Sequence, residues 1–144
     1  MLLKLLVALG VIAVAGVLWV RVAPYDPNRW HVAPRAGVEK QTARSYRALR
    51  PINAAPSVVL GAILQAAAVT PGTRLMSGDV DSGLMTFQTR SAVLGFPDYT
   101  TVSVQDGVLS IYARARFAGY DWGVNRTRVE TWLAVLGPLV GPRD

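Results

Sequence analysis

Residues 99–116, YTTVSVQDGVLSIYARAR, decide the fold, because they predict a β-hairpin whose register can be checked within the sequence. Asp106 and Gly107 form the dipeptide that a type I′ two-residue turn favours, since both central residues of that turn need positive φ. Across the two strands that this turn joins, apolar residues pair with apolar residues and polar residues with polar ones. A register shift of one residue would destroy this match. The central pairs are Val104 with Leu109, Ser103 with Ser110, and Val102 with Ile111.

The predicted hairpin has one apolar and one polar face, because successive side chains of a strand point to opposite sides. The apolar face carries Val102, Val104, Leu109, Ile111 and Ala113. The polar face carries Thr101, Ser103, Ser110, Tyr112, Arg114 and Arg116. We expect helices to pack on the apolar face, whereas the polar face needs water, a ligand or a partner.

The flanking elements follow from hydrophobic periodicity. Residues 58–69 predict a buried helix that ends at Thr70-Pro71-Gly72, and residues 74–77 and 84–90 predict strands. A last helix begins with Asp121 as its N-cap and ends at Gly137-Pro138. Its apolar stripe is Val129, Trp132, Leu133 and Leu136.

These elements predict the α+β class: one N-terminal transmembrane helix, then an antiparallel sheet of about four strands with two helices on one face. Residues 1–23 are expected to be a transmembrane signal-anchor helix and residues 57–144 the α+β domain. The region between them, residues 24–56, is rich in proline and is expected to be an extended juxtamembrane segment. Within residues 24–56, the sequence pattern suggests one short strand, near residues 45–49.

The N-terminal apolar run is long enough to cross a bilayer, which needs about 20 predominantly apolar residues. Residues 5–20 contain no charged side chain, and we expect Leu2 to Val22 to contact the lipid bilayer. The alternative is a cleaved signal peptide with small residues at Ala13, Ala15 and Gly16. Cleavage there would leave an apolar tail on the mature protein, which favours an uncleaved anchor.

Two arguments about the side of the membrane oppose each other. Four basic residues follow the span (Arg21, Arg29, Arg35 and Lys40), and the positive-inside rule would keep them in the cytoplasm. A head of three residues before Lys4 instead resembles a signal-anchor, which exports the chain after it. We expect a single-pass protein of the bacterial inner membrane, with its domain on the periplasmic side.

Charged residues concentrate where the predicted strands give way to the last helix. The residues proposed to bind an anion or a partner are Arg90, Arg114, Arg116, Asn125 and Arg128. Backbone donors and the dipole at a helix N-terminus would favour an anion at such a place. The structural alternative is that Asp121 caps the helix and Asp98 forms an ion pair with an arginine, which is a common use of polar residues at element ends.

Several sequence motifs support a family assignment: Arg90-Ser91, Phe96-Pro97-Asp98, IYARAR at residues 111–116, and DWGVNRTRV at residues 121–129. This block resembles the domain of unknown function 1499 family of bacterial and plastid proteins. Upstream, APYDPNRWHV at residues 23–32 is similar to the juxtamembrane segment of an alphaproteobacterial membrane-anchored subgroup. The resemblance implies a membrane-associated or envelope protein, and it brings no established activity.

No reaction centre is recognisable in the sequence. The chain has no cysteine and one histidine, His31, which leaves no zinc site of the usual composition. His31 is expected to be solvated near the membrane. No nucleophile motif, phosphate loop or dinucleotide fingerprint is present, so we expect no catalytic residues, no cofactor and no metal.

The net charge of +6 comes almost entirely from arginine, because only Lys4 and Lys40 are lysines. Arginine excess is typical of anion or anionic-lipid contact, and equally of a genome rich in G and C. Nucleic acid is not expected, since aromatic residues do not interleave with the arginines. Two functions follow: a non-enzymatic interaction or accessory domain for a membrane protein or complex, or a module that binds an anionic small molecule or lipid headgroup.

Overall fold

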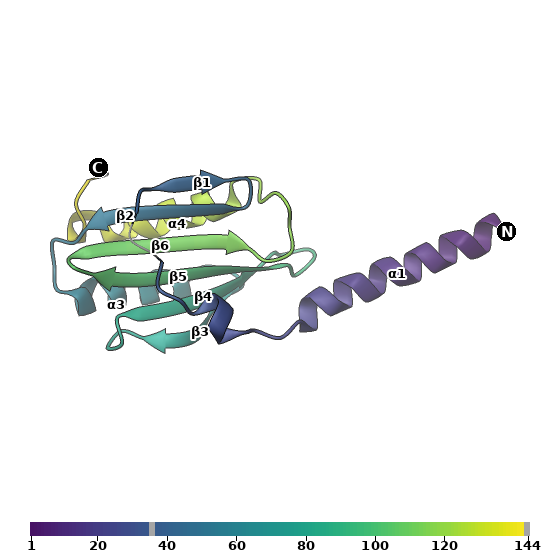
Figure 1. The fold of residues 1–144 in the computed structure, drawn as a ribbon, viewed down its shortest axis with the longest axis horizontal. Coiled ribbons are helices and arrows are strands. Elements are labelled where there is room, and N and C mark those ends of the chain that lie inside the picture. Colours follow the sequence, from purple (N-terminus) through teal and green to yellow (C-terminus); the bar gives the residue numbers. More distant parts are fainter. Residues whose placement is uncertain (35–36, 143–144) are drawn as a thin grey trace.

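The computed structural model describes residues 1–34 and 37–142. Its helices are α1 (Leu2–Val22), α2 (Pro27–Trp30), α3 (Pro56–Ala68), α4 (Val124–Leu136) and the 3₁₀ turn η1 (Gly137–Leu139). Its strands are β1 (Lys40–Thr42), β2 (Ser45–Pro51), β3 (Thr73–Asp79), β4 (Leu84–Arg90), β5 (Pro97–Gln105) and β6 (Val108–Ala115). The class is α+β, as predicted, and α1 projects from the end of the domain (Figure 1).

The β5–β6 hairpin has the predicted register. Val104 pairs with Leu109, Ser103 with Ser110, and Val102 with Ile111. Both turn residues have positive φ, 50° at Asp106 and 75° at Gly107, as a type I′ turn requires. The sequence pattern is therefore sufficient to place this hairpin.

The sheet has six strands, so the prediction of about four is wrong. The strand order is β1-β2-β6-β5-β4-β3, and every described pair is antiparallel. The two additional strands lie in residues 24–56, which were expected to be extended, and the sheet therefore begins upstream of the predicted boundary at residue 57. Of these two additional strands, the sequence predicts β2, near residues 45–49, and does not predict β1. β2 pairs along nearly all of β6, and this distant partner stabilises as a strand a segment that ends in proline.

Helices α3 and α4 cover the apolar face of the sheet (Figure 1). Phe87 of β4 and Trp132 of α4 meet edge to face with ring centroids 5.4 Å apart. Trp132 also donates its indole N–H to Thr70 at the end of α3. The two predicted helices thus pack on one face, as expected. The largest buried apolar side chains of this core are Tyr46, Leu60, Ile63, Met85, Phe87, Leu109, Ile111, Trp132 and Leu136.

The polar face of the sheet is covered by residues 23–34, which we call the strap. α2 belongs to the strap and lies across the sheet on the side opposite α3 and α4 (Figure 1). Trp30 is 5% exposed and stacks on Tyr99 of β5 with ring centroids 4.4 Å apart. His31 is half-buried, and its Nδ1 lies 3.0 Å from the Thr86 hydroxyl, so the expectation of a solvated histidine is wrong.

Candidate functional site

The backbone carbonyl of Trp30 is the centre of the contact between strap and sheet. Arg114 Nη2 and the Thr101 hydroxyl each donate to this oxygen at 2.8 Å. The Thr86 hydroxyl approaches it at 3.4 Å. A guanidinium and two hydroxyls from three strands therefore satisfy one carbonyl that would otherwise be buried without a donor.

The Arg114 guanidinium also lies between two aromatic rings. Its carbon is 5.1 Å from the centroid of Trp30 and 4.7 Å from that of Tyr112, within the range of cation–π attraction. Burial lowers the pKa of Arg114, and the nearby Arg29 and Arg47 lower it further, against opposing effects of Tyr112 and Tyr25. Arg114 stays charged at physiological pH, because an arginine starts from a value far above it.

Two further predicted arginines donate to backbone carbonyls in the last turn of α1 and just after it. Arg116 Nη1 donates to Pro24 O at 2.7 Å, and Arg90 Nη2 donates to Arg21 O at 2.9 Å. Arg90 Nη1 also donates to Gly95 O at 2.7 Å. Thus Arg90, Arg114 and Arg116 all donate to backbone carbonyls of the chain itself, between residues 21 and 30. Their partners in this structure are neutral carbonyl oxygens rather than anions.

The remaining predicted residues form a separate network at the start of α4. Arg128 Nη1 donates to Asn125 Oδ1 at 2.8 Å, and its Nη2 meets Asp98 Oδ2 at 3.4 Å. Asn125 in turn donates to Asp121 Oδ2 at 2.9 Å. The ion pair expected for Asp98 is present. The pKa of Asp98 is raised by burial, although the neighbouring Arg128 acts to lower it. Burial lowers the pKa of Arg128.

The N-cap of α4 is Gly123 rather than the predicted Asp121. Gly123 has φ 77°, a left-handed conformation that glycine adopts without strain. Asp121 Oδ1 instead accepts from the backbone N–H of Gly123 at 2.9 Å, so the carboxylate fixes the turn before the helix. The sequence placed Asp121 correctly near the helix start, but the predicted N-cap lies two residues too early in the chain.

A basic cavity of about 390 Å³ lies beside the strap, at the edge of the polar face. Arg29 comes from α2, Arg44 from the β1–β2 turn, and Arg114 from β6. No Asp or Glu is among the described residues that line it, and Arg114 Nε is buried there without a hydrogen bond in the described structure. Of the predicted anion-binding residues only Arg114 belongs here. The others lining the cavity are Trp30, Thr42, Ser45, Tyr112 and Ala115.

Comparison with known proteins gives a family over most of the chain. Residues 20–136 match the family described as protein of unknown function (DUF1499). The chain belongs to the DUF1499 family. The matched region begins in the last turn of α1 and contains the strap together with all six strands. The strap is thus part of the DUF1499 domain and not a linker in front of it.

Other comparisons add little to this assignment. No curated protein matches the sequence. Among solved structures, a DUF4468 family protein from Bacteroides ovatus is 11% identical, with a TM-score of 0.35 over 63% of this chain and 63% of its own. This chain spans less than two thirds of that protein, and the similarity carries no argument about function.

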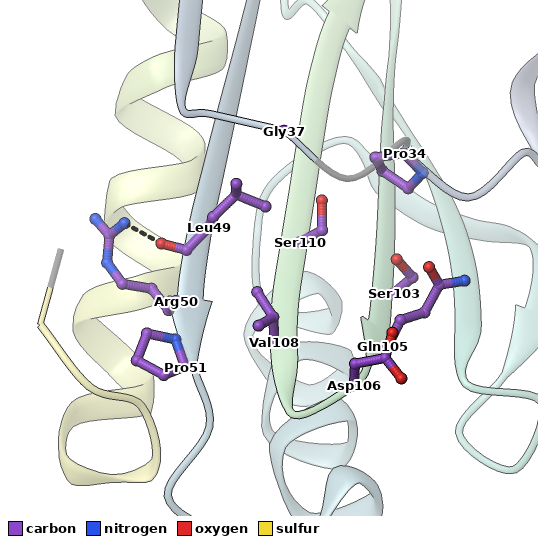
Figure 2. A pocket seen from close by; sticks show the side chains of 10 residues that line it. All are labelled: Pro34, Gly37, Leu49, Arg50, Pro51, Ser103, Gln105, Asp106, Val108 and Ser110. Carbon is purple, nitrogen blue, oxygen red and sulfur yellow. Dashed lines mark hydrogen bonds between the residues drawn. The ribbon is translucent and has the colours of Figure 1, made fainter. Parts of the chain in front are cut away.

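A second cavity, of about 310 Å³, lies on the same face of this DUF1499 domain at the opposite end of the sheet (Figure 2). Pro34 and Gly37 pass over it, and Ser103 and Ser110 rise from its floor. Two charged side chains among the described residues line it: Asp106 of the β5–β6 turn, and Arg50, which is bonded to Glu39 and to the Leu49 carbonyl. None of the predicted site residues lines this cavity, which offers an incoming group hydroxyls, the Gln105 amide, the Asp106 carboxylate and apolar surface.

Sequence reasoning missed Arg29 and Arg44 as cavity residues. Both lie in the segment that was expected to be extended, and neither has a local pattern that places it beside Arg114. One usable signal was present: Trp30 follows Arg29 and is too large and apolar to remain solvated in a segment without structure. Predicting that Trp30 is buried would have led to the prediction that the strap packs on the polar face of the sheet.

Proposed function

We propose that this DUF1499 protein is a membrane-anchored, non-enzymatic envelope protein whose domain serves as an interaction or accessory module for a membrane protein or complex. Its place is the bacterial inner membrane, with a single span and the domain on the periplasmic side. Residues 23–32 support this, because they resemble the juxtamembrane segment of an alphaproteobacterial membrane-anchored subgroup. The observation that supports this most is the strap, which links an apolar helix to the sheet through buried contacts.

The helix α1 suits a membrane span. It has 21 residues, so it is about 30 Å long, close to the thickness of the hydrocarbon core. None of its residues is buried by the rest of the chain. An apolar helix of this length needs another apolar environment, which a bilayer supplies. A signal sequence near an N-terminus has the same length and composition, and the contacts of Arg21 with the domain favour an anchor over a cleaved signal.

Membrane retention of the full-length protein tests the anchor. The wild type is expected to stay in the membrane fraction after alkaline carbonate extraction, with the mass of the uncleaved chain. Val11→Arg combined with Val14→Arg should release it, because each arginine at the centre of a span opposes insertion by roughly 2.5–3.5 kcal/mol. The matched control is Val135→Arg, at an exposed position of α4, which should remain in the membrane.

Two results of this experiment would contradict the anchor. One is a soluble wild-type protein with a mass that shows removal of residues up to the strap. The other is equal retention of all three proteins. A reporter enzyme that is active only outside the cytoplasm, fused to the C-terminus, tests the periplasmic side by its activity, and a fluorescent protein that folds only in the cytoplasm gives the converse signal.

A second candidate function is the binding of an anionic group in the basic cavity. Arg29, Arg44 and Arg114 surround it, and guanidinium groups bind phosphate and carboxylate in a bidentate manner. Native mass spectrometry of the detergent-extracted protein would show a co-purified lipid or small molecule. Arg44→Ala is the informative variant, because the Arg44 side chain donates to Ala115 O and, within the described residues, to no group of the strap.

The control variant for the anion site is Arg74→Ala, at an exposed position of β3 outside the cavity. We expect Arg44→Ala to lose a bound phosphate- or carboxylate-bearing ligand and Arg74→Ala to keep it. Equal retention of ligand in both variants would contradict the site. A stoichiometric protein partner recovered from solubilised membranes, with no bound ligand, would instead favour the interaction module.

A further inference from the structure

The loop between β4 and β5, residues 91–96, is fixed against the end of α1. Arg21 Nε donates to Leu94 O at 3.3 Å, and Arg21 Nη2 donates to Val93 O at 3.2 Å. In the other direction, Arg90 at the base of the loop donates to Arg21 O. Because Arg21 is in the last turn of the apolar helix, these contacts hold the loop at the level where a membrane anchor leaves the hydrocarbon core.

Residues 116–123, between β6 and α4, lie at the same end of the sheet. The strand register shows this, since Asp98 near the start of β5 faces Ala115 at the end of β6, and Arg90 faces Pro97. In Figure 1 both loops lie on the side from which α1 departs. Two loops of the domain therefore face the plane in which the bilayer surface would lie.

These two loops expose apolar and aromatic side chains. Trp122 is 84% exposed and Val93 is 82% exposed, whereas a tryptophan is usually well buried. Tyr120 packs edge to face on Trp122, with ring centroids 5.1 Å apart. Tryptophan and tyrosine favour the headgroup zone, where one part of the ring is apolar and the other is hydrated. The exposed apolar residues of the two loops are Val93, Leu94, Phe117, Tyr120 and Trp122.

The outward position of Trp122 is built into the backbone. Trp122 has φ 56°, a left-handed conformation that is unusual for a bulky residue. Neighbouring contacts hold this turn: Asp121 N donates to Ala43 O at 2.9 Å, and Asp121 Oδ1 accepts from Gly123 N. Strained backbone that its surroundings enforce is a common feature of functional surfaces.

Basic side chains at this end suit an anionic membrane surface. Arg21, Arg44 and Arg116 lie on or beside the two loops, and each is bonded to a backbone carbonyl rather than to a carboxylate. The acids nearby, Asp98 and Asp121, are bonded to Arg128, Asn125 and Gly123. The positive charge of these arginines is therefore available to lipid phosphates.

We propose that residues 91–96 and 116–123 form a membrane-contact surface, which places Val93, Tyr120 and Trp122 in the headgroup zone beside α1. The occupant is the lipid bilayer, because the contacts of Arg21 bring this end of the domain to the point where the anchor ends. This inference rests on the proposed anchoring by α1. With both contacts the domain rests on the membrane in one orientation and directs the β5–β6 turn away from it.

The absence of cysteine makes site-directed labelling direct. Single variants Val93→Cys and Tyr120→Cys carry an environment-sensitive fluorophore in the full-length protein, reconstituted in vesicles of phosphatidylethanolamine and phosphatidylglycerol. Gln105→Cys, at the far end of β5, is the control in water, and Val11→Cys, in the middle of α1, is the control in the bilayer. Lipids brominated on their acyl chains quench a fluorophore that lies in the membrane.

We expect brominated lipid to quench the labels at residues 11, 93 and 120 and to leave the label at residue 105 unquenched. Unquenched labels at residues 93 and 120, together with a quenched label at residue 11, would overturn the membrane-contact surface and leave the anchor standing. An unquenched label at residue 11 would overturn the anchor as well. Quenching at residue 105 equal to that at residue 93 would also overturn the proposal, because the domain would then have no fixed orientation.

Discussion

At the scale of single residues, Arg114 contributes most to the contact between strap and sheet. Its guanidinium donates to Trp30 O and to the Thr101 hydroxyl, both at 2.8 Å, and packs against two rings. Hydrogen bonds from a charged group contribute about 1.5–3 kcal/mol each. A lysine keeps the charge but cannot reproduce the planar fork of donors. Arg114 is therefore a structural residue first, whatever the adjacent cavity binds.

Arg114→Ala should lower the free energy of unfolding by about 3 kcal/mol, because it leaves the Trp30 carbonyl with hydroxyl donors alone. Arg114→Lys should fall between this variant and the wild type. Urea unfolding in detergent, followed by circular dichroism, measures the differences. The control is Arg74→Ala on the surface of β3, which should change stability by less than about 0.5 kcal/mol. Equal stability of Arg114→Ala and Arg74→Ala would contradict this role.

Asp98 should make stability fall as pH rises. Burial raises the pKa of this carboxyl, despite Arg128, so the folded state holds its proton more tightly than the unfolded chain does. The contribution of Asp98 is then fully present below its ordinary value of 3.8 and is lost as pH rises through the higher folded value. The Asp98→Asn variant should lack this decrease in the free energy of unfolding with rising pH.

Urea midpoints measured from about pH 3 to about pH 7 test the role of Asp98, as the difference between wild type and Asp98→Asn at each pH. Other carboxyls titrate alike in both proteins and cancel in this difference. A difference that does not change with pH would show that Asp98 titrates at its ordinary value. Asp121→Asn offers a comparison at a neighbouring carboxyl of the same network.

The residue types of the site could be predicted from sequence, but their partners could not. Alternation along β6 put Arg114 and Arg116 on the polar face, and an ion pair between Asp98 and an arginine was expected as the structural alternative. The acceptors of the arginines are backbone carbonyls of residues 24 and 30, far away in the chain. A carbonyl occurs in every residue, so no side-chain pattern marks the ones that an arginine will bind.

At the scale of elements, glycine is favourable in the β5–β6 turn and unfavourable in helix α3. Gly107 has φ 75° and open space around it, so an alanine there suffers from backbone strain and not from a clash. Gly61 lies within α3 with nothing within 4 Å of an added Cβ. The same substitution should therefore have opposite effects at the two positions.

Gly107→Ala should lower the free energy of unfolding by about 1–2 kcal/mol, the strain of a left-handed residue with a side chain. Gly61→Ala should raise it by about 0.5–1 kcal/mol, because alanine is the better helix former. Thermal unfolding of both variants beside the wild type decides between these signs. A stabilised Gly107→Ala protein would show that this turn is not type I′ in solution.

Elements whose signal is local could be predicted, and those that depend on distant pairing could not. The hairpin carries its own register in Asp106-Gly107 and its flanking residues, and α3 carries its own periodicity. β2 ends in a proline and lies in a proline-rich region, and its regularity comes from pairing with β6 more than fifty residues later. β1 has three exposed residues and exists through its pairing with β2.

At the scale of the whole molecule, the strap joins an apolar helix to a folded domain without a flexible linker. Arg90, Arg114 and Arg116 hold the backbone of residues 21, 30 and 24. Trp30 packs on Tyr99 in the middle of the sheet. An arginine-rich sheet face, which the sequence presents as a surface for an external ligand, is thus covered largely by the protein's own chain. Among the described residues, two cavities remain on this face: the basic cavity beside Arg29 and Arg44, and the one under Pro34 and Gly37.

Oxidative footprinting of Trp30 in the full-length protein in lipid nanodiscs tests the docked strap most directly. Trp132, which is 1% exposed in the core, is the internal reference for a protected ring, and the urea-unfolded chain is the reference for an exposed one. We predict that hydroxyl radicals oxidise Trp30 as slowly as Trp132, and that Arg114→Ala accelerates oxidation of Trp30 alone. Oxidation of Trp30 in the wild type at the rate of the unfolded chain, while Trp132 stays protected, would contradict the account.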